Sequence, residues 1–254
     1  MIQHLSNSYH YFPVSYIISC MKIILFQAIF LGYLYLTLMT LIFFYNTKYI
    51  DALLMNSLIY FIISFILFFI FLKMREKRFS YACIITFSRM IINIIIFSLI
   101  LFYEEISLGY LIVVLALISL FLDGLDGYLS KLFNESSKFG SVFDMETDTL
   151  LMLVLSLSLY MNFNSHIFIL IIPFYRYLFV FMQKKITFLS KDLSESFLRK
   201  FICATVTLML ILCHIPGTTI NIITYTINFA IFLITFSFAR DIIWLYKNKN
   251  NGNI

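Results

Sequence analysis

Long apolar runs separated by short polar stretches make up most of this chain. Each run is close to the roughly 20 residues that an α-helix needs to cross a bilayer. The runs lie at 17–45, 52–73, 81–102, 106–122, 141–162, 166–183, 201–215 and 219–246. The pattern predicts an all-α polytopic membrane protein with about eight transmembrane helices. The seventh run is short, and it spans fully only if it begins near Leu198.

The composition supports this class. Hydrophobic residues make up 62% of the 254 residues and charged residues only 12%, with a mean hydropathy of +0.96. A soluble domain of this length has no way to bury so much apolar surface. The four Cys and four His are scattered and show no zinc-ligand spacing, so we expect none of them in a site.

Lys and Arg residues gather in alternate loops and account for the net charge of +5. The cations that follow the second, fourth, sixth and eighth runs are Lys73, Arg75, Lys77, Arg78, Lys131, Lys138, Lys184, Lys185, Lys191, Arg199, Lys200, Lys247 and Lys249. Short cytoplasmic loops carry such an excess. We therefore predict that both termini are cytoplasmic, that the basic loops contact membrane lipid rather than nucleic acid, and that the first run stays as an uncleaved anchor.

Four aspartates between the fourth and fifth runs stand out against this background. Asp123, Asp126, Asp144 and Asp148 fall within or beside segments that otherwise resemble membrane helices. An Asp at mid-bilayer is about 2.5–3.5 kcal/mol unfavourable, so several together indicate a bound cation or a polar cavity. A plain polar turn between two spans is the alternative, but a turn does not require carboxylates inside the next span.

The spacing of the aspartates indicates one site. On helices, Asp123 and Asp126 project to one face, and so do Gly140, Asp144 and Asp148, whereas Glu146 points elsewhere. An all-carboxylate ligand set favours Mg²⁺ or Mn²⁺ over zinc. Glycines around the site indicate that a ligand approaches the backbone closely.

These residues resemble the signature of the CDP-alcohol phosphatidyltransferase family. The family pattern is Asp-x2-Asp-Gly-x2-Ala-Arg-x8-Gly-x3-Asp-x3-Asp, and this chain has each of its Asp and Gly residues, with Ser130 and Lys131 in place of Ala-Arg. Upstream, IITFSR at 84–89 is similar to the Thr-x-x-Arg of the first core helix. Arg176 and the segment 233–241 resemble the phosphatidylglycerophosphate and cardiolipin synthase branch, although Tyr177 replaces an acidic residue.

The resemblance implies transfer of a phosphatidyl group from CDP-diacylglycerol to a small alcohol, with release of CMP. It implies that Asp123, Asp126, Asp144 and Asp148 hold Mg²⁺ or Mn²⁺ and that Asp148 is also the catalytic base. The nucleotide would lie against four further positions. These are Gly127, Ser130, Lys131 and Gly140.

The acceptor alcohol is harder to predict. Arg176 lies about eight residues inside the sixth run, where an Arg indicates function by default, and a phosphorylated acceptor such as glycerol 3-phosphate would need such a cation. Snorkelling, or pairing with a structural carboxylate, is the alternative for Arg176. Arg89 is either an anchor at the end of its span or an acceptor contact, and serine or another uncharged alcohol stays open.

The resemblance also divides the chain. We expect a two-helix membrane extension at 1–78, a six-helix catalytic core at 79–246 and a cytoplasmic tail at 247–254. The expected location is a bacterial inner membrane with the active site on the cytoplasmic side, and a homodimer is left open. A Mg²⁺-dependent intramembrane prenyltransferase is one alternative function, but it generally needs two separated Asp clusters. A non-enzymatic polytopic transporter is the other.

Overall fold

The computed structural model describes most of the chain, namely residues 14–44, 49–74, 81–102, 107–132, 137–162, 165–185 and 197–247. Within these residues it has eight α-helices, one short 3-10 helix and no strand. The helices are α1 (Val14–Phe43), α2 (Tyr49–Met74), α3 (Tyr81–Phe102), α4 (Ser107–Leu132), α5 (Lys138–Asn162), the 3-10 helix η1 (Ile167–Leu170), α6 (Ile171–Lys185), α7 (Phe197–Leu212) and α8 (Ile220–Lys247).

Five of the described helices are long and apolar enough to cross a membrane. The qualifying segments of α1 to α4 and α8 are Leu25–Phe43, Tyr49–Lys73, Ala82–Phe102, Gly109–Leu129 and Ile220–Tyr246. The other three are short or charged: α6 and α7 have 15 and 16 residues, and α5 carries three carboxylates in its first half. The protein is an all-α polytopic membrane protein, as the apolar runs predict.

The structure differs from the apolar runs at the aspartates. The fourth run ends at residue 122, but α4 continues to Leu132, because helical hydrogen bonds do not require apolar side chains. The next helix begins at Lys138, three residues before the fifth run, and the Ser137 hydroxyl accepts a hydrogen bond from the Gly140 amide at 2.9 Å. That contact caps the first turn of α5. All four aspartates therefore lie on helices.

The seventh helix also starts earlier than its apolar run. It covers Phe197–Leu212 rather than 201–215. The basic residues Arg199 and Lys200 are thus part of its first turn. The helix ends where Cys213 and His214 turn the chain toward α8.

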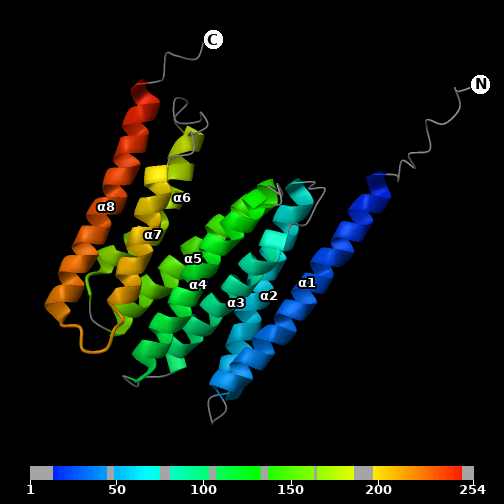
Figure 1. Cartoon of the computed structure of the whole chain (residues 1–254), viewed down its shortest axis with the longest axis horizontal. Helices are drawn as coiled ribbons and strands as arrows, with labels where there is room; N and C mark the ends of the chain where they lie inside the picture. The colour runs from blue at the N-terminus through cyan, green and yellow to red at the C-terminus, as the bar shows by residue number, and fades with distance from the viewer. Residues whose placement is uncertain are drawn as a thin grey trace, which may run out of the picture.

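Helix α3 is the centre of the bundle. In its membrane segment 72% of the residues are buried, compared with 17% in α1 and 28% in α4. It contacts α1 and α2 on one side and α4 and α5 on the other (Figure 1). A helix enclosed in this way presents any polar side chain it carries to another helix rather than to lipid.

The N-terminal helices α1 and α2 join α3 through buried polar contacts. Ser98 donates a hydrogen bond to the Asn56 side-chain oxygen, and Asn56 donates to the Thr40 hydroxyl at 3.1 Å. Tyr60 donates to the Ile29 carbonyl at 2.7 Å across the tight crossing of α1 and α2, where Gly32 lies. Since buried polar groups are costly without partners, these contacts specify how the pair packs on α3.

Most helix ends that carry basic residues lie at one end of the bundle. Lys73 ends α2, Lys138 begins α5, Lys185 ends α6, and Arg199 begins α7. Figure 1 shows these ends on the side where α1 begins and α8 ends. The end of α4 and the start of α5, which carry the aspartates, are on this same side.

Candidate active site

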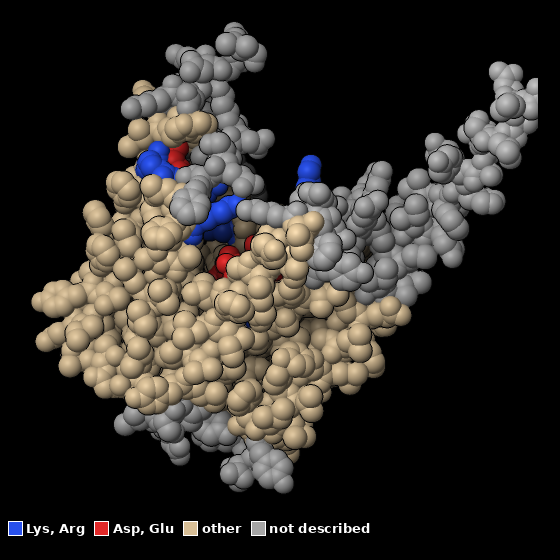
Figure 2. Space-filling model, viewed as in Figure 1, with Lys and Arg blue, Asp and Glu red and all other residues tan. Residues whose placement is uncertain are grey.

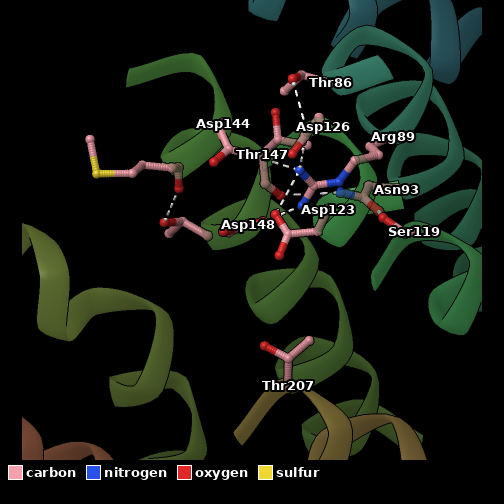
Figure 3. Close-up of polar contacts among 12 residues, drawn as sticks. Thr86, Arg89, Asn93, Ser119, Asp123, Asp126, Asp144, Thr147, Asp148 and Thr207 are labelled. Carbon is pink, nitrogen blue, oxygen red and sulfur yellow. Dashed lines mark hydrogen bonds and ion pairs between the residues drawn. The ribbon is translucent and has the colours of Figure 1, made fainter. Parts of the chain in front are cut away.

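Four carboxylates from two helices meet at this end of the bundle. Asp123 and Asp126 lie less than one turn apart on α4, and Asp144 and Asp148 lie one turn apart on α5. Each pair therefore projects from one helix face. Figure 3 shows the four carboxylates turned toward one another around a side chain from α3.

That side chain is Arg89, which is buried, with only 1% of its surface exposed. Its Nη1 lies 2.9 Å from Asp123 Oδ1, 3.0 Å from Asp126 Oδ2 and 2.7 Å from Asp144 Oδ1. Its Nη2 pairs with Asp148. The sequence is compatible with Arg89 as an anchor or an acceptor contact, and the structure places it against the aspartates.

Further polar side chains of α3 and α4 support this arrangement. Thr86 donates to Asp126 Oδ2 at 3.2 Å, and Asp126 is itself buried. Asn93, one turn after Arg89, donates to the Thr147 carbonyl at 3.1 Å and accepts from the Ser119 hydroxyl at 2.9 Å. These contacts join α3, α4 and α5 next to Arg89 and the carboxylates (Figure 3). They restrict how far the helices move apart.

The sequence did not predict the contacts of Asn93 and Ser119. The available signal was an Asn inside the isoleucine-rich segment Ile91–Ile96. A polar side chain at membrane depth requires a partner, and that requirement predicts an interhelical contact. The partner itself could not be predicted, because Ser119 and Thr147 are 26 and 54 residues away.

The carboxylates form a ligand set suited to a hard divalent cation. One oxygen each from Asp123, Asp126 and Asp144 lie within 4.8 Å of one another. Oxygen ligands so close together fit Mg²⁺ or Mn²⁺, which carboxylates bind in preference to softer metals. Asp148 lies outside this group of three, and its side chain is 40% exposed compared with 5% for Asp126. Asp148 is thus the more accessible of the two.

The glycines near the site occupy two different surroundings. A Cβ added to Gly127 would have no neighbour within 4 Å, so the surface beside Asp126 is open. At Gly140 a Cβ would lie 3.3 Å from the Cys83 sulfur of α3. Gly140 therefore permits close packing of α5 on α3. Ser130 and Lys131 belong to the last turn of α4, and their side chains lie outside the described part of the structure.

Arg176 does not join the aspartates. Its Nη2 lies 2.6 Å from Glu146 Oε1, its Nη1 donates to the Thr149 hydroxyl at 3.1 Å, and Tyr177 donates to Glu146 Oε2 at 2.6 Å. Glu146 and Thr149 lie on a face of α5 other than that of Asp144 and Asp148. Glu146 points away from the cluster, as its spacing predicts, and Arg176 has the carboxylate partner that was one of its two predicted roles.

A cavity of about 210 Å³ adjoins this ion pair rather than the aspartates. Its walls are mostly apolar side chains of α2, α3, α5 and α6, including Ile66, Met90 and Phe174, and Glu146 and Tyr177 also line it. None of the four aspartates lines this cavity. Figure 2 shows acidic and basic side chains that meet in a recess of the surface.

A second ion-paired group lies between α7 and α8. Arg199 Nη1 is 3.4 Å from Asp241 Oδ2, and Arg240 Nη2 is 3.0 Å from Asp241 Oδ1. Two guanidinium groups share one carboxylate here, so the group carries a net positive charge. It lies at the end of the bundle that also holds the aspartates.

The comparison with known families agrees with this geometry. Residues 79–239, more than half of the chain, match the family model of the CDP-alcohol phosphatidyltransferases. The match includes Arg89 and all four aspartates. No curated protein and no solved structure matches the chain. The protein belongs to the CDP-alcohol phosphatidyltransferase family and is an enzyme of phosphatidyl transfer.

Proposed function

We propose that this enzyme transfers a phosphatidyl group from CDP-diacylglycerol to a small alcohol and releases CMP. The observation that carries the proposal is the cluster of four aspartates at the end of α4 and the start of α5, within the family match. A divalent cation held there would neutralise the pyrophosphate and the departing CMP. Asp123, Asp126 and Asp144 are the proposed ligands, because their oxygens lie within 4.8 Å of one another. Asp148, which lies outside this group of three, is the proposed fourth ligand.

Asp148 is the proposed general base. Its side chain is 40% exposed, so an incoming hydroxyl has access to it, and its pairing with Arg89 Nη2 orients the carboxylate. In the proposed step, Asp148 takes the hydroxyl proton while the alcohol oxygen attacks the phosphorus of the phosphatidyl group. The phosphorus–oxygen bond to CMP breaks as the new bond forms, and CMP leaves with its electron pair.

The nucleotide would lie over the open surface of α4. Gly127 has no neighbour within 4 Å of a hypothetical Cβ, which leaves room for a ligand beside Asp126. Ser130 and Lys131 follow on the same helix, toward its end. Gly140 contributes by bringing α5 close to α3. We place this end of the bundle at the cytoplasmic face of a bacterial inner membrane, since Lys73, Lys138 and Lys185 lie at the same end.

Isotope exchange is the direct test of the proposed reaction. Purified enzyme with Mg²⁺ or Mn²⁺, supplied with CDP-diacylglycerol, an acceptor alcohol and its phosphatidyl product, should incorporate labelled CMP into CDP-diacylglycerol by reversal of the transfer, and Asp126→Ala should abolish the exchange. A prenyltransferase or a transporter would show no CMP-dependent exchange. An enzyme preparation that is folded, metal-supplied and inactive in this assay would overturn the proposal.

Glycerol 3-phosphate is the acceptor that we propose, with Arg176 as its phosphate contact. Support comes from the position of Arg176 at membrane depth and from its side chain, which is 27% exposed despite the pair with Glu146. To bind a phosphate, Arg176 would share its guanidinium between Glu146 and the acceptor. The Arg199–Arg240 group supplies further positive charge at the end of the bundle that holds the aspartates.

Two matched variants separate acceptor binding from structural pairing at Arg176. Loss of a charge-assisted phosphate contact costs about 1.5–3 kcal/mol, so Arg176→Ala should lower kcat/KM for glycerol 3-phosphate about 10- to 150-fold. Glu146→Gln should leave acceptor binding intact, because it frees the guanidinium. Equal losses of thermal stability in both variants, without a change in acceptor KM, would assign Arg176 to structure alone. Turnover with serine or inositol, and none with glycerol 3-phosphate, would exclude the proposed acceptor.

A further inference from the structure

The guanidinium of Arg89 lies where the three proposed metal ligands converge. Nη1 is within 3.0 Å of one oxygen on each of Asp123, Asp126 and Asp144. Oxygen ligands of these same three residues lie within 4.8 Å of one another. A Mg²⁺ or Mn²⁺ ion that binds these oxygens at about 2.1 Å needs nearly the same place as Nη1. The guanidinium and a metal ion thus compete for the same lone pairs.

The charges at the site make this competition consequential. Four carboxylates surround one guanidinium, and Arg89 and Asp126 are both buried. Like charges at this distance repel strongly away from water, so the internal cation stabilises the carboxylates as a group. The same cation repels any second cation. Arg89 therefore acts on both the stability of the cluster and its affinity for metal.

The remaining contacts of Arg89 indicate how it is held. Its Nε is buried and has no hydrogen-bond partner among the described residues. Both terminal nitrogens, in contrast, are paired with carboxylates. The carboxylates themselves thus hold the guanidinium, rather than a separate set of acceptors. The position of the Arg89 side chain therefore depends on the negative charge of the four aspartates.

We propose that Arg89 is an internal counter-cation that competes with the divalent metal and thereby sets the metal affinity of the aspartate cluster. It is a positioning residue for the carboxylates rather than an acceptor contact. This inference rests on the proposed metal site. It predicts that removing the charge of Arg89 increases metal affinity, whereas a purely supporting residue would decrease it.

Direct metal binding tests the inference without any lipid substrate. Free Mn²⁺ measured by electron paramagnetic resonance, with purified protein in detergent, gives the affinity of each variant. Arg89→Gln should bind Mn²⁺ at least tenfold more tightly than the parent, which corresponds to about 1.4 kcal/mol. Arg89→Lys keeps the positive charge but loses the second terminal nitrogen, so its Mn²⁺ affinity should lie closer to the parent than to Arg89→Gln. Unchanged or weaker binding by Arg89→Gln would overturn the inference.

A second variant covers the case in which Arg89→Gln does not fold. The double variant Arg89→Gln with Asp148→Asn keeps the net charge of the site and all three close carboxylates, and it too should bind Mn²⁺ more tightly than Asp148→Asn alone. Thermal midpoints add a second measurement: Mn²⁺ should raise the midpoint of the Arg89→Gln proteins more than that of the parent. A loss of stability that Mn²⁺ does not restore would indicate a structural role only.

The outcomes also separate this inference from the proposed function. If the parent shows CMP exchange and binds Mn²⁺, but Arg89→Gln binds no more tightly, only the role of Arg89 is wrong. If the parent binds no Mn²⁺ at all, the proposed metal site and the role of Arg89 both fail. Tighter Mn²⁺ binding by Arg89→Gln in a protein that lacks CMP exchange would support the counter-cation while removing the proposed reaction.

Discussion

At the scale of single residues, the main feature is one buried arginine shared by four carboxylates. Arg89 lies 34 to 59 residues away from its partners Asp123 to Asp148 in the chain. The four aspartates have a recognisable spacing, which made them predictable as a group. The arginine has no such pattern, because an Arg near the end of a membrane helix is equally compatible with a lipid headgroup contact.

Substitutions at Asp148 and Asp126 should separate proton transfer from metal binding. Asp148→Asn removes a proton acceptor but keeps an oxygen that can bind metal and accept from Arg89 Nη2, so Mn²⁺ affinity should fall less than in Asp126→Ala. Turnover should fall by about 10²–10⁴, the usual contribution of a general base. Asp126→Ala should lose both Mn²⁺ binding and turnover. The measurements are Mn²⁺ titration and CMP exchange on the same preparations.

Asp51→Asn is the matched control, because this carboxylate is exposed at the start of α2. It should leave both measurements unchanged. If Asp148→Asn turns over at the parent rate, its role as base is wrong even where the metal site is right.

His214 makes the stability of the protein depend on pH. The ring is buried in the turn between α7 and α8, and its Nδ1 donates to the Leu210 carbonyl at 2.8 Å. Burial lowers the pKa of His214 from 6.5 to about 4. The unfolded chain therefore takes up a proton at a higher pH than the folded protein. The resulting stability is complete above about pH 6.5 and declines as the pH falls toward 4.

The thermal midpoint measured across this pH range checks the effect of His214. From pH 6.5 to 4 the parent should lose free energy of unfolding on the order of 3 kcal/mol more than His214→Gln, which does not titrate. Parallel pH profiles for the two proteins would contradict a buried neutral histidine.

At the scale of elements, the crossing of α1 and α2 depends on a single glycine. A Cβ at Gly32 would lie 2.5 Å from the Tyr60 hydroxyl oxygen, so Gly32→Ala forces the tyrosine to move and to weaken its hydrogen bond to Ile29. Overpacking of this kind costs about 1–3 kcal/mol. The thermal midpoint of Gly32→Ala should fall accordingly, and adding Tyr60→Phe should restore part of the loss.

Gly124→Ala is the matched control for this crossing, because a Cβ at Gly124 meets nothing within 4 Å. That change should be neutral or slightly stabilising, since Ala favours the helix by about 1 kcal/mol. Equal destabilisation by the two substitutions would show that the contact with Tyr60 does not decide the effect at Gly32.

The helices that carry the aspartates show how element boundaries serve the site. Hydropathy marks where a helix leaves the apolar region, and it ended the fourth run at residue 122. The helix itself continues to Leu132, and this continuation places Asp123 and Asp126 on one rigid face. A pattern of apolar residues does not detect the polar end of a helix. The spacing of three and four residues between the aspartates nevertheless indicates helices.

At the scale of the whole molecule, the N-terminal pair of helices supplies none of the residues of the aspartate cluster. All four aspartates and Arg89 belong to α3, α4 and α5, whereas α1 and α2 contact α3, where Ser98 bonds to Asn56, and α2 also packs against α5. Deleting residues 1–72 should therefore reduce expression and membrane integration more than CMP exchange per folded molecule. The deletion exposes apolar surface of α3 and leaves Ser98 without its partner.

A companion deletion that also carries Ser98→Ala removes that unpaired hydroxyl. It should recover part of the yield, because a buried polar group without a partner costs about 1–3 kcal/mol. Complete loss of exchange in a folded and correctly inserted deletion would show that the N-terminal helices contribute directly to the reaction.

The sequence by itself determined the class of the protein, the approximate positions of its helices and the aspartate motif. Each of these depends on neighbours close in the chain: apolar runs reflect the thickness of the bilayer, and spacings of three and four residues reflect one turn of helix. The predicted separation of Glu146 from the aspartates follows from the same local geometry. Family membership rests on the same motif and on the match over residues 79–239.

Only the tertiary structure decided which charges meet. Arg89 lies among the aspartates and Arg176 lies against Glu146, although both arginines occur at comparable places in apolar helices. Their partners come from other helices, and the choice depends on how α3 and α6 pack against α5. A charge that is removed from water needs an opposite charge nearby to offset its desolvation cost. Which opposite charge is nearby depends on how the helices pack. The residues next to each arginine in the sequence therefore do not predict its partner.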